Sequence, residues 1–169
     1  MRVILSKKDM AQAKQAAALR YQLARAAGVE DKLIGKNHSC EAVDLVGIKA
    51  EIAVAKLFDA DFDPNALGID SGVDLYVTGL RGELGLQVKA THHKDAKWML
   101  INPDPEDEWD VAVFVRPCDM DQVMEVVGVV TKNRCMDLVE QTDLGHGLTA
   151  GVKAENLSCP SILWKNLNA

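Results

Sequence analysis

The chain has 169 residues and a mass of 18.4 kDa, and 48% of its residues are hydrophobic and 26% charged. This is the size and composition of one globular domain, which excludes a disordered chain, a collagen-like fibre and a disulfide-rich miniprotein. No apolar run approaches the roughly 20 residues that cross a bilayer, and the first residues lack the apolar core of a secretory signal. We therefore expect a cytoplasmic protein.

The charge of the chain is divided unevenly along its length. The net charge is −6. Residues 1–37 hold eight basic and three acidic side chains, a net charge of +5, while residues 38–169 hold 11 basic and 22 acidic ones, a net charge of −11. We expect residues 1–37 to form a basic helical arm packed on a single domain of residues 38–169. Such an arm permits a local contact with nucleic acid.

Two helices are predicted in the first third of the chain. Ser6 and Asp9 form the pattern of a helix N-terminus, in which a hydroxyl is followed by an acid three residues later. The alanine-rich sequence after them predicts a helix to about Ala27, which a glycine follows. After a loop at residues 33–39, a second helix is predicted over residues 41–58.

The apolar pattern changes from helical to strand-like after the second helix. Strands are predicted at residues 73–77, 84–90, 110–115 and 124–130, with a turn at 79–82 that joins the first two as a hairpin and an acidic, solvated loop at 104–110. The last two strands are apolar enough to be buried on both faces. A short helix at 131–140 and an apolar segment at 162–164 follow. This order predicts one mixed α/β domain.

The strand at residues 84–90 carries polar side chains at alternate positions. Gln87, Lys89 and Thr91 point to one face, and the residues between them are apolar. A polar face on such a strand is either exposed to solvent or part of a site. If the strand pairs with the preceding one as a hairpin, Asp74 approaches Gln87 and Lys89 on the same face.

One carboxylate on the second predicted helix lies next to the apolar stripe of that helix. Leu45, Ile48, Ile52 and Ala55 have the spacing of a core-facing stripe. Glu51 falls at the edge of this stripe. We therefore expect its carboxylate to face the sheet and not water.

Taken together, these residues resemble the PD-(D/E)XK nuclease superfamily. The resemblance lies in Glu51 on a helix, Asp74 on a strand and the pair Gln87 and Lys89 on the next strand, and it covers roughly residues 42–131. The Gln-x-Lys form is most similar to Mrr-type restriction endonucleases and related phage and repair nucleases. The implied fold is restriction-endonuclease-like, an α/β fold with a mixed β-sheet flanked by helices, here with an N-terminal helical arm.

The resemblance implies a deoxyribonuclease that uses Mg²⁺ or Mn²⁺ to activate water. Phosphodiester hydrolysis needs an activated water and shielding of the phosphate charge, and Mg²⁺ prefers hard oxygen ligands. By the family's pattern Asp74 is the central metal ligand. The Gln87 amide, the backbone carbonyl of Val88 and Glu51 complete the protein's share of the ligands. Lys89 positions or polarises the attacking water.

The segment after this strand adds positive charge beside the implied site. Its candidate nucleic-acid-binding residues are Thr91, His92, His93, Lys94 and Lys97. One interpretation is an edge that contacts phosphates next to the scissile bond, and the other is a solvated strand end. The first helix, with Lys14, Arg20 and Arg25, could lie along a DNA backbone, although such helices are more often solvated elements packed on a domain.

Two features depart from the commonest form of the family's pattern. Residue 87 is a neutral glutamine, which donates less charge to a metal unless Glu51 or Asp70 contributes, and Val73 stands where the pattern has proline. The alternative function is therefore a catalytically inactive member that binds DNA or a protein partner as an accessory factor. A small-molecule enzyme is unsupported, because the sequence offers no nucleophile–base pair and no cofactor loop.

The resemblance also implies the partners of the chain. DNA is the expected substrate, and a homodimer is expected because a small nuclease of this kind usually dimerises to cut both strands. We expect no nucleotide cofactor and no membrane contact. If the chain is phage-encoded, its compartment is the cytoplasm of the host.

Overall fold

The structure is a computed structural model that describes residues 1–26, 40–63, 72–80, 82–145 and 147–167. Its main element is a five-stranded sheet with the order β1 (Arg2–Ile4), β6 (Val123–Thr131), β5 (Val111–Pro117), β3 (Gly82–Ala90) and β2 (Leu75–Gly79). β3 and β5 are parallel, and the other neighbours are antiparallel. The chain is therefore a mixed α/β protein, and the predicted hairpin pairing of β2 with β3 is confirmed.

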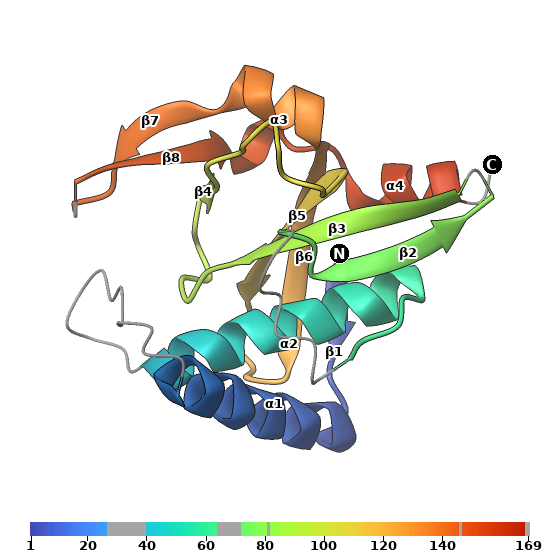
Figure 1. The fold of residues 1–169 in the computed structure, drawn as a ribbon, viewed down its shortest axis with the longest axis vertical. Helices are drawn as coiled ribbons and strands as arrows, with labels where there is room; N and C mark the ends of the chain where they lie inside the picture. Colours follow the sequence, from blue (N-terminus) through green and yellow to red (C-terminus); the bar gives the residue numbers. More distant parts are fainter. Residues whose placement is uncertain (27–39, 64–71, 81, 146, 168–169) are drawn as a thin grey trace.

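The two faces of this sheet are covered by different elements (Figure 1). On one side lie α1 (Lys7–Ala26) and α2 (Cys40–Phe58). On the other side lie α3 (Lys132–Leu138) and a three-stranded sheet with the order β4 (Trp98–Leu100), β8 (Leu148–Lys153) and β7 (Glu140–Asp143). The 3-10 turn η1 (Ala154–Asn156) and α4 (Pro160–Leu167) end the described chain. None of the helices that the structure describes is long and apolar enough to cross a membrane.

Strand β5 separates two hydrophobic cores. Its residues Val111, Val113 and Val115 belong to the core beneath α2, whereas Ala112 and Phe114 belong to the core beneath β4 and α3. All five are buried. The prediction that this strand is buried on both faces is therefore confirmed, and the side chains of its neighbour β3 are likewise divided between the two sides of the sheet.

The N-terminal segment is built into the first core. The predicted helix start is confirmed, because the Asp9 N–H donates to Ser6 Oγ at 3.2 Å and the Ser6 N–H donates to Asp9 Oδ2 at 2.7 Å. Ala13, Ala16 and Ala17 of α1 are buried in the core that α2 also enters, since small side chains let two helices approach closely. β1 adds an edge strand by pairing with β6.

Several elements of the fold differ from the sequence prediction. The strands β1, β4, β7 and β8 were not predicted, and the apolar segment 162–164 is part of α4. β2 begins one residue after Asp74, so Asp74 lies at the entry to the strand and not within it. The predicted loop at 33–39 and Asp70 lie outside the described residues.

Candidate functional site

Asp74 is fixed to the neighbouring strand by two hydrogen bonds. Its backbone N–H donates to the carbonyl oxygen of Leu86 at 2.8 Å, and its Oδ2 accepts from the backbone N–H of Val88 at 2.7 Å. The carboxylate therefore lies against the β3 backbone at the residue between Gln87 and Lys89. Burial raises the pKa of Asp74, and this effect outweighs the opposing effects of the Val88 N–H and the positive charge of Lys89.

Glu51 enters the site from α2. It is one of two charged residues that are buried among the described residues, and Ile48, Ile52 and Ala55 of the same helix are buried with it. The expectation that Glu51 lies out of water is therefore confirmed. Burial raises the pKa of Glu51, the ion pair with Arg20 opposes this rise, and the charge of Asp74 adds to it.

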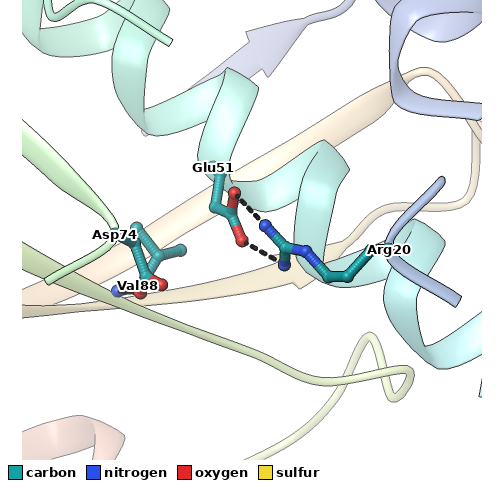
Figure 2. A network of polar contacts seen from close by, with 4 residues as sticks. All are labelled: Arg20, Glu51, Asp74 and Val88. Carbon is teal, nitrogen blue, oxygen red and sulfur yellow. Dashed lines mark hydrogen bonds and ion pairs between the residues drawn. The ribbon is translucent and has the colours of Figure 1, made fainter. Parts of the chain in front are cut away.

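Arg20 of α1 holds Glu51 through both oxygens of the carboxylate. Arg20 Nη1 donates to Glu51 Oε1 at 3.0 Å, and Nη2 donates to Oε2 at 3.2 Å. Figure 2 shows this fork, with Asp74 and Val88 on the other side of Glu51. Burial alone would lower the pKa of Arg20, but Glu51 and the more distant Asp74 raise it. Arg20 is thus a cation close to two carboxylates, bound to one of them.

Arg20 was not assigned to this site from the sequence. It lies 31 residues from Glu51 in the chain, outside the region that resembles the nuclease pattern. The available signal was indirect. A carboxylate expected to be buried needs a cation nearby, and the basic arm was the nearest source of one.

Gln87 and Lys89 lie on the side of β3 that faces the second core. The β3–β5 register places Gln87 beside Ala112 and Lys89 beside Phe114. The positive charge of Lys89 lowers the pKa of Asp74, so these two groups lie within electrostatic range of each other. The Gln87 amide nitrogen lies beside Gly72, 3.4 Å from where a Cβ of that residue would stand. Asp74 thus connects Glu51 on one side of the sheet with Lys89 on the other.

The acidic loop before β5 holds a further carboxylate next to Gln87. Asp107 Oδ2 accepts from the Asp104 N–H at 3.0 Å and from the Trp109 indole N–H at 2.9 Å, and these bonds lower the pKa of Asp107. Its Oδ1 lies 3.7 Å from the Cβ position at Gly72. The sequence predicts an acidic, solvated loop here, or an acidic lid over a basic groove, and does not indicate that the Trp109 indole holds the Asp107 carboxylate near Gln87.

The five candidate nucleic-acid-binding residues line one cavity. It has a volume of about 790 Å³ and begins where β3 ends. Thr91, His92, His93, Lys94 and Lys97 border it, together with Trp98, Phe114 and Leu148. Lys94 forms an exposed ion pair with Asp119 at 2.6 Å. The cavity is therefore lined by apolar side chains and by Lys94 and Lys97, together with the acidic Asp95.

Asp74 and the residues around it could hold a hard divalent cation. In the described part of the chain, no group of three or more Asp, Glu, His or Cys side chains is arranged to hold a metal. Mg²⁺, however, is commonly held by one or two carboxylates and several waters. Asp74 and Glu51 supply the carboxylates, and the Gln87 amide and Val88 carbonyl are further oxygens on the adjacent strand. In the structure, the positive charge next to Glu51 is the guanidinium of Arg20.

Comparison with known proteins identifies no family for this chain. The sequence matches no known protein-family model, and no curated protein gives a match. What supports a function is the arrangement of the residues themselves.

Proposed function

We propose that this chain is a deoxyribonuclease that hydrolyses phosphodiester bonds with Mg²⁺ or Mn²⁺, on a restriction-endonuclease-like α/β fold. The observation that carries the proposal is the buried carboxylate of Glu51 close to the half-buried carboxylate of Asp74, with the ammonium group of Lys89 in electrostatic range of Asp74. Buried charges cost free energy, so a cluster of them in one place is typical of a functional site.

The order of elements supports the same proposal. Helix α2 carries Glu51, the entry to β2 carries Asp74, and β3 carries Gln87 and Lys89. Because β2 and β3 pair as a hairpin against the core of α2, Asp74 lies beside the β3 backbone at Val88, and its charge acts on Glu51. This is the sequence of elements that the resemblance to the PD-(D/E)XK nucleases implies.

Asp74 and Glu51 would hold the cation, and the Gln87 amide and Val88 carbonyl would complete the protein's ligands. When bound, a divalent cation supplies a water of lowered pKa and shields the charge of the phosphate. The neutral Gln87 leaves the charge of the site to the two carboxylates. Asp74 keeps a fixed orientation for this role because the Val88 N–H holds one of its oxygens.

Lys89 supplies positive charge where negative charge develops. As an ammonium group it donates hydrogen bonds to the attacking water or to a non-bridging phosphate oxygen, and a half-buried position strengthens this interaction. The water oxygen bonds to phosphorus, and the bond from phosphorus to the leaving sugar oxygen breaks. The attacking water gives up a proton to solvent, and the leaving oxygen takes one from solvent.

The cavity after β3 provides a path for the DNA strand. Its border from Thr91 to Lys97 begins two residues beyond Lys89, so a phosphate bound at this border lies near the reacting one. Side chains with positive charge bind phosphates without regard to sequence. We therefore expect the enzyme to select DNA by its form and not by a long recognition sequence.

A cleavage assay tests the proposal. The wild type, Lys89→Ala and the control Lys165→Ala on α4 are compared on plasmid, linear duplex, branched and single-stranded DNA, with Mg²⁺ or Mn²⁺. We expect the wild type and the control to cut at the same rate, and Lys89→Ala to be at least ~100-fold slower. Equal cutting by all three proteins, or no cutting by a folded wild type, would contradict the proposal.

One observation favours the alternative of a non-cutting DNA- or protein-binding factor. Arg20 already neutralises Glu51 through both of its oxygens, as a site that has lost its cation would require. Thermal stability distinguishes the two functions. A nuclease is stabilised by Mg²⁺ or Mn²⁺ in a manner that depends on Asp74, and a factor without a cation site is not.

A further inference from the structure

Arg20 and a divalent cation compete for the same two oxygen atoms. The guanidinium fork takes Oε1 and Oε2 of Glu51, so both oxygens of this carboxylate are engaged. The Glu51 side chain is 8% exposed, and burial leaves little room for water to separate two cations on it. Two positive charges on one carboxylate repel each other strongly in such a site.

Arg20 also has the freedom to move that Glu51 lacks. Its side chain is 26% exposed against 8% for Glu51, and its guanidinium is joined to α1 by a long, unbranched stem. Glu51 lies on α2, and most of its neighbours on that helix are buried in the first core. When the pair separates, Arg20 is therefore the partner that moves.

The chemistry of the guanidinium identifies its second ligand. A planar fork of N–H donors matches the two non-bridging oxygens of a phosphate as well as the two oxygens of a carboxylate. The only large source of negative charge that the proposed reaction brings to this site is the phosphodiester of the substrate. A phosphate bound near Asp74 and Glu51 would lie within the region that Arg20 already reaches.

We propose that Arg20 is a substrate-binding residue that pairs with Glu51 in the cation-free protein, releases Glu51 to the divalent cation, and then binds a phosphate of the DNA. This inference rests on the proposed nuclease function and adds a residue from the N-terminal helix to it. It also gives α1 a role beyond packing, because the helix carries a phosphate ligand into the site.

Calorimetric titration with Mn²⁺ alone tests the competition. We compare the wild type with Arg20→Met, which keeps most of the aliphatic stem. The control is Arg25→Met on the same helix, because the guanidinium of Arg25 stacks on Tyr21 and not on Glu51. At one pH for all three proteins, Arg20→Met should bind Mn²⁺ about tenfold more tightly because a competing cation is gone. An affinity equal to that of the wild type or weaker would overturn the proposal.

Binding of DNA tests the second half of the exchange. Fluorescence anisotropy with labelled duplex and single-stranded oligonucleotides is measured in Mn²⁺ with Lys89→Ala in every protein, so that the strand is not cut. Adding Arg20→Met should weaken binding about tenfold, whereas adding Arg25→Met should change it by less than about threefold. Arg20→Lys keeps the charge without the fork, and its affinity should lie between these two.

The outcomes separate this inference from the function on which it rests. If the wild type binds neither Mn²⁺ nor DNA, both the nuclease proposal and the role of Arg20 are wrong. If the wild type binds Mn²⁺ through Asp74 and cuts DNA, but Arg20→Met behaves as Arg25→Met does, then only the inference about Arg20 is wrong. Thermal melting of each variant confirms that the comparison is made between folded proteins.

Discussion

Two ion pairs in different regions of the molecule, one at the α1–α2 contact and one beyond the end of β3, have similar lengths and different surroundings. Arg20 and Glu51 are 3.0 Å apart beneath the helical face, with side chains 26% and 8% exposed. Lys94 and Asp119 are 2.6 Å apart at the cavity beyond β3, with side chains 57% and 83% exposed. The shorter pair is the one that water surrounds, so distance alone does not rank their importance.

Burial decides what each pair does. An exposed pair gains little because water screens it and two long side chains lose freedom. A buried pair has lost the hydration of both charges, and apolar residues of the same size would often be at least as stable in its place. Glu51 lies close to Asp74, and burial raises the pKa of both carboxyls, as the cation site that we propose would require.

Removal of one partner from each pair should give the largest difference between the two regions. Arg20→Ala leaves Glu51 buried without its partner and should lower the free energy of unfolding by about 3 kcal/mol. Lys94→Ala should leave stability unchanged within error, since its partner stays hydrated. Denaturation in urea at neutral pH measures both changes. Equal losses in the two variants would contradict the comparison.

The pH dependence should also differ between the two regions. The pKa values of Glu51 and Asp74 are raised in the folded protein, so the cation-free protein should lose stability as the pH rises from the ordinary carboxylate pKa to these raised values. Cation binding requires both groups to be ionised. The gain in melting temperature from Mg²⁺ should therefore disappear on acidification before ordinary carboxylates begin to take up protons. A gain that persists into the ordinary carboxylate range would contradict this expectation.

Substitution of Asp74 should have a smaller effect, and in the opposite direction. Asp74→Asn keeps an oxygen that can accept the Val88 N–H and removes a charge that burial disfavours. Without a divalent cation, the melting temperature should rise by about 3 °C, which corresponds to roughly 1 kcal/mol for a chain of this size. Scanning calorimetry checks this. A fall in melting temperature would mean that the ionised carboxylate stabilises the fold.

The smallest effect is expected at the exposed border of the cavity. Lys97→Ala should leave the fold intact and reduce DNA affinity by a similar factor for all sequences. The slope of log affinity against log salt should become shallower by about 1, as expected for the loss of one phosphate contact. An unchanged slope would show that Lys97 is not in contact with the backbone. The same titration on Lys165→Ala is the control.

The parts of the fold that depend on neighbouring residues could be predicted from the sequence. The N-terminal cap of α1 is formed within the four residues 6–9. The alternation of side chains along β3 places Gln87 and Lys89 on one side. The burial of Glu51 follows from the spacing of Ile48 and Ile52 around it. Each of these features is set by the local period of the chain.

The parts that depend on distant partners could not be predicted in the same way. β7 has the sequence Glu-Gln-Thr-Asp, without a strand-like pattern, and exists because β8 supplies its hydrogen bonds. Arg20 contacts Glu51 because small alanine side chains let α1 and α2 pack closely together. Asp107 joins the site because Trp109 and the loop backbone hold its carboxylate. Nothing within a few residues of these positions indicates the contact.

The most direct test of the central claim, that Glu51 and Asp74 form a cation site, is a calorimetric titration of Mn²⁺ into the wild type and into Asp74→Asn. We predict that the wild type binds the cation and that Asp74→Asn, although folded and at least as stable, binds it at least ~100-fold more weakly. Equal affinity in the two proteins, or no binding by the wild type, would show that Glu51 and Asp74 are not a cation site.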